Sequence, residues 1–305
     1  MVDIKLGLKP EEIISTIGDY EALVVRSQTQ VSAKVIQAGE KLQVIARAGV
    51  GVDNIDVEEA TRRGIVVVNA PTGNTISTAE YTIALMLSLA RHIPQANAML
   101  KSGVWRRSDF IGTEVRNKTL GIIGLGNIGS EVARRAQAFE MKVIAYSPSI
   151  PSEHARELRV ELVPLKQLLK ESDFITMHTR MSPEKRGMIG EKELALVKPT
   201  VRIINTARGG LIDEEALAKA VKEKRVAGAA IDVFCTEPCT KSILFESDRI
   251  IVTPHLGAST TEAQAMAAKD IARQIIDVFK GQPARHAVIK VASTGGKLVS
   301  QLPEE

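Results

Sequence analysis

The chain of 305 residues is long enough for two domains, each with its own core. Hydrophobic residues make up 44% of it and aromatic residues 3%, so the cores must consist mainly of Ala, Val, Ile and Leu, as in parallel sheets covered by helices. The net charge of +4 is spread without a dense basic tract, which argues against a nucleic-acid partner. No apolar run reaches the length of a membrane span, and no secretion signal opens the chain. We therefore expect a cytoplasmic protein that acts on small molecules, without a nucleic-acid or membrane partner.

Three short runs in the N-terminal part, 22–25, 44–46 and 65–68, have the composition of strands. A helix is expected over 79–90, where Ser77 followed by Glu80 has the spacing of a capping box. Near the other end, a helix is expected over 261–280, opened by Ser259 with Glu262 and ended by Gly281. The tail after Val291 is polar and unpatterned.

Between these two helices, β-branched runs alternate with amphipathic segments, which is typical of a parallel, doubly wound sheet. Six runs are predicted as strands: 119–123, 142–146, 174–178, 202–206, 229–233 and 250–253. Helical segments are predicted at 130–139, 165–171 and 214–224. Six strands match a complete dinucleotide-binding domain. The order predicts nested domains, a dinucleotide-binding domain over 72–255 inserted into an α/β substrate domain made of 1–71 and 256–305.

A glycine motif follows the first of the six predicted strands. Gly124 permits a tight turn, Gly126 lets the backbone approach a pyrophosphate, and Gly129 allows close packing of the following helix. The helix N-terminus offers free N–H groups to the phosphates. An NAD site also expects a carboxylate at the end of the second strand, and this chain has Ser147 there. The motif predicts dinucleotide binding, while Ser147 weakens the choice of NAD over NADP.

Three residues late in the chain stand just past predicted strands, where open α/β sheets bind ligands. They are Arg208, Glu237 and His255. Hydride transfer from a hydroxy acid needs a base for the hydroxyl proton, which suits His, and a cation for the carboxylate, which suits Arg. A carboxylate would orient the imidazole. Taken singly, they could equally be a surface ion pair, a loop Glu and a helix-capping His; together, behind a nucleotide motif, they favour a dehydrogenase.

The two cysteines, Cys235 and Cys239, have the spacing of half a metal site. No second Cys/His pair completes four ligands. We therefore expect ordinary loop thiols in a reducing compartment and no bound metal.

Further motifs extend the pattern over nearly the whole chain, from Val2 to Val288. They are Arg47-Ala-Gly-Val-Gly-Val-Asp-Asn, Asn69-Ala-Pro-Thr-Gly-Asn, Asn205-Thr-Ala-Arg-Gly-Gly and Pro254-His-Leu-Gly-Ala-Ser-Thr. With the glycine motif, they resemble the D-isomer-specific 2-hydroxyacid dehydrogenase family. Within it, the chain is most similar to the branch that acts on D-3-phosphoglycerate, in a short form without a regulatory domain.

The resemblance implies a role for each matching residue. His255 would be the general acid and base, Glu237 its carboxylate partner, and Arg208 the group that binds the 2-oxo or 2-hydroxy acid. Substrate contacts would come from Arg47, Gly49, Val50 and Asn74. Besides the three glycines, cofactor contacts would come from Asn127, Ile128, Ser147, Thr179, Thr206, Ala207 and Asp232.

Two departures from the family pattern concern the adenosine ribose. Ser147 replaces the branch's usual Asp, and Arg180 replaces a usual Pro in the turn after Thr179. Loss of a carboxylate and gain of a guanidinium both favour a 2′-phosphate. The resemblance implies NAD as cofactor, and these residues add the hypothesis that NADP is accepted too. The alternative is that Arg180 points into solvent.

A third departure is that the family's opening strand and helix have no counterpart. The segment 2–6 and the helical pattern after it resemble the family's second strand and helix. In a flavodoxin-like sheet the first strand is interior, so its loss would leave neighbouring strands unpaired. We expect reduced stability and a tendency to associate.

The resemblance favours oxidation of D-3-phosphoglycerate to 3-phosphohydroxypyruvate, at the entry to serine biosynthesis. The alternatives are a glyoxylate or hydroxypyruvate reductase and, from another class, a dinucleotide-sensing protein like the corepressors that share this fold. A homodimer or homotetramer is expected. The helix 79–90 and its continuation toward Trp105 are candidates for the dimer surface, unless they pack against their own domain.

Overall fold

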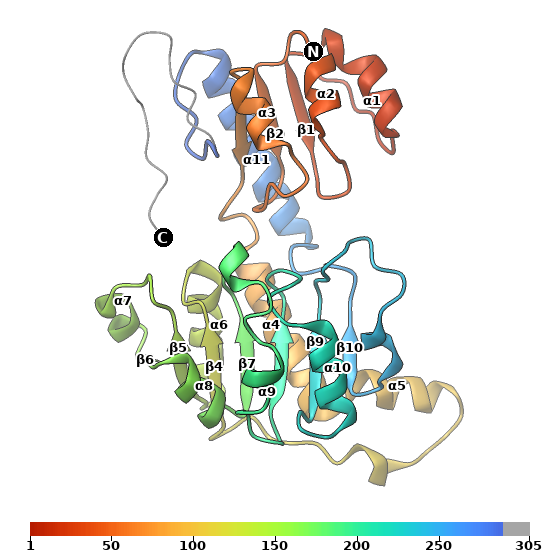
Figure 1. The fold of residues 1–305 in the computed structure, drawn as a ribbon, viewed down its shortest axis with the longest axis vertical. Helices are drawn as coiled ribbons and strands as arrows, with labels where there is room; N and C mark the ends of the chain where they lie inside the picture. Colours follow the sequence, from red (N-terminus) through yellow and green to blue (C-terminus); the bar gives the residue numbers. More distant parts are fainter. Residues whose placement is uncertain (289–305) are drawn as a thin grey trace. The chain divides into compact units, whose positions relative to one another are not determined.

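The computed structural model describes residues 1–288 (Figure 1), and the polar tail after Val291 lies outside the described residues. The chain divides into two compact units. One consists of Met1–Asn74 and the segment that starts at Ala258, and the other of Thr75–Gly257. The borders lie three residues after the expected 71 and two after the expected 255.

The unit Thr75–Gly257 is built on a parallel sheet of seven strands in the order β10-β9-β8-β7-β4-β5-β6. In chain order, the strands are β4 (Thr119–Ile123), β5 (Lys142–Tyr146), β6 (Glu161–Leu162), β7 (Phe174–Met177), β8 (Arg202–Asn205), β9 (Gly228–Ile231) and β10 (Ile250–Val252). β4 has β5 on one side and β7 on the other, so the winding of the chain reverses there. Ligands bind at such a switch point, beyond the carboxyl ends of the strands.

All six predicted strands are present, and the prediction of a doubly wound parallel sheet is confirmed. Sequence reasoning missed β6. Its two residues, Glu161 and Leu162, are both exposed, because β6 lies at the edge of the sheet. A strand of this kind has no apolar run that could reveal it.

Helices cover both faces of this sheet (Figure 1). One face carries α4 (Thr75–Arg91), α6 (Asn127–Ala138) and α7 (Ser152–Glu157). The other carries α8 (Leu165–Glu171), α9 (Glu191–Leu194), α10 (Glu214–Lys222) and the short η4 (Ile243–Glu246), while η3 (Pro183–Lys185) follows β7. Successive residues of β4, Ile122 and Ile123, are both buried and belong to opposite cores. The strands are therefore apolar on both faces, as the sequence indicated.

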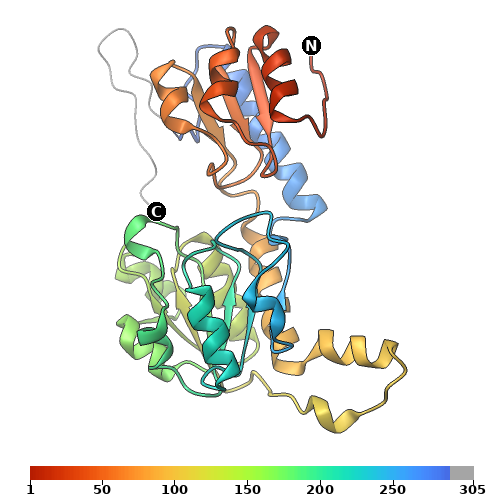
Figure 2. The same ribbon diagram turned by 45° about the vertical axis from the view of Figure 1, so that its right-hand side comes forward.

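Helix α4 begins at Thr75, so the predicted capping box at Ser77 is wrong, and Ser77 lies inside the first turn. Met86 and Ala79 are buried in the core of the same unit. By contrast, α5 (Ile93–Lys101) and η2 (Arg107–Phe110) have no buried side chain, and Figure 2 shows their segment projecting from the sheet. We call residues 93–111 the α5 arm. Of the two expectations for 79–90, burial against its own domain is the one observed.

The other unit has a parallel sheet of three strands in the order β1-β2-β3. The strands are β1 (Ala22–Val25), β2 (Val44–Arg47) and β3 (Val66–Asn69). One face is covered by α1 (Pro10–Thr16), η1 (Ile17–Asp19), α2 (Ala33–Ala38) and α3 (Val57–Arg62), and the other by α11 (Thr261–Phe279). In β2, Val44, Ile45 and Ala46 are inaccessible to solvent, which makes this strand the centre of the unit.

Two expectations for this unit are wrong in detail. The segment Met1 to Leu6 forms no strand, and Val2, Ile4 and Leu6 are almost fully exposed. Strand β1 lies at the edge of the sheet, and among the described residues no strand pairs with its open edge. Helix α11 is capped by Thr260, whose side chain accepts a hydrogen bond from Ala263 N–H, rather than by Ser259. The predicted stop at Gly281 agrees with its φ of 70° just past the helix.

Candidate active site

The turn between β4 and α6 has the shape that a dinucleotide needs. Gly124 has φ of 98°, and a Cβ there would lie 2.7 Å from the carbonyl of His178. A Cβ on Gly129 would collide with the carbonyl oxygen of Gly124, whereas one on Gly126 would meet nothing within 4 Å. The first and third glycines thus allow a tight turn against the helix, and the second faces open space. A pyrophosphate fits this cradle, since α6 begins directly after Gly126.

The peptide of Leu125, between the first two glycines, is held from both sides. Its N–H donates to Ser147 Oγ at 3.1 Å, and its carbonyl accepts from Ser130 Oγ at 3.2 Å. Ser147 stands just past β5, at the predicted ribose position. Because the hydroxyl accepts from the turn, its own proton stays available to a ligand.

The segment after β7 lies beside this turn. The hydroxyl of Thr179 accepts a hydrogen bond from Lys185 Nζ at 2.7 Å, and Arg180 is exposed. His178 is half-buried as a residue, but its Nδ1 is enclosed and has no hydrogen-bond partner, while Nε2 lies 2.9 Å from Thr176 Oγ1. Burial lowers the pKa of His178 to about 3. The imidazole therefore remains neutral near neutral pH.

The turn after β8 that carries Arg208 is shaped by Asn205, which sequence reasoning had not assigned a role. The buried side chain of Asn205 accepts from Ala207 N–H at 3.0 Å and donates to the Arg208 carbonyl at 2.9 Å. The hydroxyl of Thr206 lies 2.8 Å from that of Thr82 on α4. The Thr206 hydroxyl is thus engaged with α4.

Glu237 and His255 form a close pair. His255 Nδ1 lies 2.7 Å from Glu237 Oε2, and Glu237 Oε1 accepts from Phe234 N–H at 3.0 Å. The turn of Arg208 packs against the same segment, because a Cβ on Gly209 would overlap the Phe234 carbonyl. The structure thus brings Glu237 and His255 into contact and places the Arg208 turn beside their segment.

The electrostatics of the pair favour an ionised carboxylate. Partial burial alone would raise the pKa of Glu237, but the hydrogen bonds from His255 and Phe234 and the charges of His255 and Arg208 outweigh it, so the net shift is downward. With Nδ1 held by Glu237, the ring of His255 has one orientation. Its side chain is 39% exposed, so the ring can meet a substrate and exchange a proton with it.

Asp232 fixes the backbone around His255. Its Oδ1 accepts from Thr253 Oγ1 and from Leu256 N–H, and its Oδ2 accepts from Gly257 N–H, all within 3.0 Å. His255 itself has φ of 55°, a left-handed conformation that is uncommon for a residue with a side chain. Its N–H donates to the Asp232 carbonyl at 2.9 Å. These bonds hold the strained residue in place.

Comparison with known proteins identifies the family. The sequence model of the D-isomer specific 2-hydroxyacid dehydrogenase NAD binding domain matches residues 83–257, more than half of the chain. The chain belongs to the D-isomer specific 2-hydroxyacid dehydrogenase family. Its dinucleotide-binding unit is therefore the family's NAD binding domain, as the glycine motif predicted.

Individual proteins resemble the chain over most of its length. D-3-phosphoglycerate dehydrogenase of Synechocystis sp. is 52% identical over 99% of this chain and 57% of that protein, so the chain spans about half the length of the curated relatives it matches. The solved TT0316 protein of Thermus thermophilus is 31% identical, with a TM-score of 0.85 over 93% of this chain and 91% of that one. An acyclic imino acid reductase (Bsp5), solved with NADPH and D-Arg, is 28% identical, with a TM-score of 0.81 over 92% and 90%.

The residues expected to contact the substrate lie in the unit that contains Met1–Asn74. Arg47 Nε donates to the buried Asn54 Oδ1 at 3.0 Å, and Asn54 Nδ2 donates to the carbonyls of Arg26 and Thr29. A Cβ on Gly49 would collide with the Arg47 guanidinium. Arg47 and the 49–50 backbone are thus neighbours. Asn74, the fourth expected substrate residue, ends the N-terminal segment of this unit.

The structure also bears on the metal and membrane expectations. Within residues 1–288, no cluster of His, Cys, Asp and Glu has the arrangement of a metal site. Burial, with Glu214 nearby, raises the pKa of the Cys235 thiol to about 11, which leaves it unreactive. No helix in the described part of the chain is long and apolar enough to cross a membrane.

Proposed function

We propose that this protein is an NAD-dependent dehydrogenase that oxidises D-3-phosphoglycerate to 3-phosphohydroxypyruvate, the entry reaction of serine biosynthesis. The observation that carries the proposal is the 2.7 Å contact of His255 Nδ1 with Glu237, beside the turn of Arg208, in an NAD binding domain. The identity of 52% to a D-3-phosphoglycerate dehydrogenase supports this substrate.

In the proposed reaction, NAD would supply the acceptor for the hydride of the substrate's C2 when it is bound, and the residues of this chain would bind the substrate and move its proton. His255 takes the proton of the C2 hydroxyl at Nε2, because Nδ1 is committed to Glu237. Glu237 stabilises the imidazolium that results. Arg208 binds the carboxylate and the developing carbonyl, for which a guanidinium offers paired donors. In the reverse direction His255 returns the proton.

We propose further that the unit Thr75–Gly257 holds the cofactor and that the other unit holds the substrate. The cradle of Gly124, Gly126 and Gly129 would receive the pyrophosphate, with Asn127 and Ile128 at the start of α6. Ser147 and Thr179 would lie at the adenosine ribose, and the backbone at Thr206 and Ala207 with Asp232 at the nicotinamide. Gly49, Val50 and Asn74 would bind the substrate carboxylate and Arg47 the phosphate.

The cofactor is proposed to be NAD(H), with NADP(H) also accepted. Ser147 accepts from Leu125 N–H and can still donate its proton, so it can serve either a ribose hydroxyl or a 2′-phosphate oxygen, whereas a carboxylate would repel the phosphate. The similar fold of a reductase solved with NADPH supports the proposal that this fold can hold that cofactor. Comparing kcat/KM for the two cofactors tests the idea. A wild-type preference for NAD(H) of roughly a hundredfold or more would contradict it.

Steady-state turnover of 3-phosphoglycerate, 3-phosphohydroxypyruvate, hydroxypyruvate and glyoxylate tests the substrate. The proposal expects the phosphorylated pair to be preferred and Arg47→Gln to raise KM for that pair only. Equal turnover of hydroxypyruvate or glyoxylate would assign a reductase instead. His255→Ala should lower kcat by about 10²- to 10⁴-fold while NADH still binds. NADH binding without turnover in the wild type would point to a dinucleotide sensor.

We propose that the protein forms a homodimer through the α5 arm. Ile93, Leu100, Trp105 and Ile111 are all at least half exposed there, and exposed apolar side chains gathered on one segment favour a partner surface. Trp105→Glu with Leu100→Glu should therefore yield monomers in light scattering. A wild-type monomer, or a variant that remains a dimer, would refute the assignment.

A further inference from the structure

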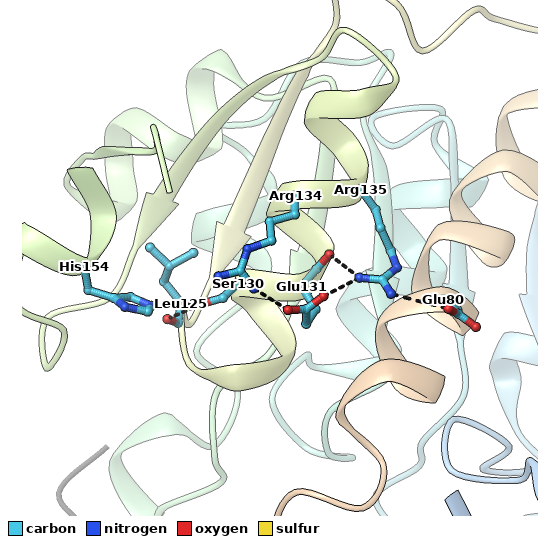
Figure 3. A network of polar contacts seen from close by, with 7 residues as sticks. All are labelled: Glu80, Leu125, Ser130, Glu131, Arg134, Arg135 and His154. Atoms are coloured by element: carbon cyan, nitrogen blue, oxygen red, sulfur yellow. Dashed lines mark hydrogen bonds and ion pairs between the residues drawn. The ribbon is translucent and has the colours of Figure 1, made fainter. Parts of the chain in front are cut away.

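The contacts of Ser130 reach beyond the dinucleotide turn. Ser130, in the first turn of α6, is buried, and its Oγ lies 3.2 Å from the Leu125 carbonyl and 2.9 Å from Nε2 of His154 on α7 (Figure 3). Figure 3 shows the three side by side, with His154 reaching toward Ser130 from outside the helix. The turn that receives the pyrophosphate is thus linked to a side chain 24 residues farther along.

The direction of these hydrogen bonds follows from the proton count. A serine hydroxyl has one proton, and the Leu125 carbonyl can only accept. When Ser130 donates to Leu125, its oxygen is left to accept, so Nε2 of His154 must be the donor. A donor at His154 polarises the Ser130 hydroxyl and strengthens its bond to the turn. Without that donor, Ser130 can rotate away from the carbonyl.

We propose that His154 is a positioning residue for the dinucleotide turn, acting through Ser130 on the Leu125 peptide. Leu125 is held from the other side by Ser147, and its side chain is inaccessible to solvent. With both ends fixed, the N–H groups at the start of α6 keep one direction toward the phosphates. The role is in cofactor affinity, because His154 contacts neither the pair of Glu237 and His255 nor the turn of Arg208 among the contacts of the described residues.

A second contact network on α6 is separate from this one. Glu131 pairs with Arg134 and Arg135, and Arg135 also reaches Glu80 of α4 (Figure 3). Hydrogen bonds and charges of the two arginines outweigh the effect of burial and lower the pKa of Glu131. The Arg135–Glu80 pair links α6 to α4, and within the described part of the chain none of the ion pairs of these residues involves the Leu125 peptide. A loosened turn in a His154 variant would therefore not imply a displaced helix.

The surroundings of His154 permit a clean experiment. The side chain lines a surface cavity of about 290 Å³ together with Arg134, Gln137, Glu157, Leu158 and Arg159. A replacement of similar size therefore has room, and unfolding is not the expected failure. His154→Phe removes the donor, while His154→Gln retains one. Glu157→Gln is the matched control, because Glu157 lines the same cavity and makes no contact with Ser130.

The experiment is titration of NADH, by its fluorescence, into the wild type and these variants, with kcat at saturating cofactor and the melting temperature measured alongside. His154→Phe should raise the Kd for NADH by about 2- to 10-fold, the effect of one lost hydrogen bond. His154→Gln should restore most of the affinity, and Glu157→Gln should leave the Kd for NADH unchanged. The value of kcat should not change in any of these variants. Ser130→Ala should raise Kd similarly, and its combination with His154→Phe should add little more.

The other outcomes overturn the inference. An unchanged Kd in His154→Phe, additive effects of the two substitutions, or failure of His154→Gln to rescue would each exclude a role through Ser130. A fall in kcat or in melting temperature without a change in Kd would assign His154 another role. The inference rests on dinucleotide binding alone: if the wild type bound neither NADH nor NADPH, the cofactor assignment itself would fail.

Discussion

Lowering the pH from 7 to 5 should cost this protein stability through His178 in particular. Among residues 1–288, its Nδ1 is enclosed without a hydrogen-bond partner, and Nε2 lies 2.9 Å from Thr176 Oγ1. Protonation of either neutral tautomer gives an imidazolium with an N–H at Nδ1, and that N–H has no acceptor. Burial therefore lowers the pKa from 6.5 to about 3. The unfolded chain takes up the proton at a higher pH than the folded chain does.

The sign and size of the effect follow by linkage. Between pH 6.5 and 3 the unfolded state binds one proton more than the folded state, so stability falls as the pH falls below 6.5. From pH 7 to pH 5 the unfolded state gains about 2 kcal/mol from this one group, at roughly 1.4 kcal/mol for each pH unit below 6.5.

Urea unfolding of the wild type and of His178→Gln at pH 7 and pH 5 measures this loss. The glutamine retains a polar group for Thr176 but does not titrate, so the variant should lose about 2 kcal/mol less than the wild type over this range. Thr176→Val is the control, because it keeps the enclosed imidazole and should keep the acid sensitivity. If the wild type and His178→Gln lost the same stability to within about 0.5 kcal/mol, the reasoning would be refuted.

Three further substitutions test the site. Gly129→Ala should destabilise the fold by about 1–3 kcal/mol and abolish NADH binding, because the added Cβ meets the Gly124 carbonyl; unchanged melting and binding would refute the close packing. Asp232→Asn should cost about 1–3 kcal/mol and most of kcat, since an amide NH₂ would face a backbone N–H; full activity would contradict its role. Glu237→Gln should lower kcat, and its stability difference from the wild type should shrink in acid. The lowered carboxyl pKa of Glu237 stabilises the fold fully above pH 4.5, and this gain is lost as the pH falls through the folded pKa. A difference that stays constant from pH 7 to pH 3 would exclude the linkage.

The parts of the fold that the sequence predicted well are those with strong local patterns. β4 and β5 begin and end at the predicted residues, because each is a buried apolar run between polar residues. The helix caps were harder to place. Ser77 and Ser259 both stand next to threonines, and the structure begins the first helix earlier and caps the second with Thr260. Several adjacent residues there are of types that cap helices, so the local pattern alone does not choose between them.

The site was predictable wherever a residue acts from a strand end and unpredictable where it acts through a distant contact. The glycine motif and the pair of Glu237 and His255 follow from spacing and topology. The hydrogen bond of Ser147 to the glycine turn joins residues 22 positions apart, and no periodicity signals it. The same holds for Asn205, whose amide shapes the turn of Arg208. From the sequence, Ser147 was notable only because it stands where an NAD site usually has a carboxylate.

The two acidic residues near His255 divide one task between them. Asp232 is inaccessible to solvent, and burial raises the pKa of its carboxyl, yet its acceptor positions meet donors of the 253–257 segment. Glu237 is partly exposed, and its pKa is lowered. A carboxylate that fixes backbone can be buried, because its partners never move during a reaction. In the proposed reaction, a carboxylate that stabilises the charge of His255 must stay ionised, which favours the more exposed position and the nearby charge of Arg208. Asp232 thus holds the backbone of His255, which has a strained left-handed conformation, and Glu237 orients its ring.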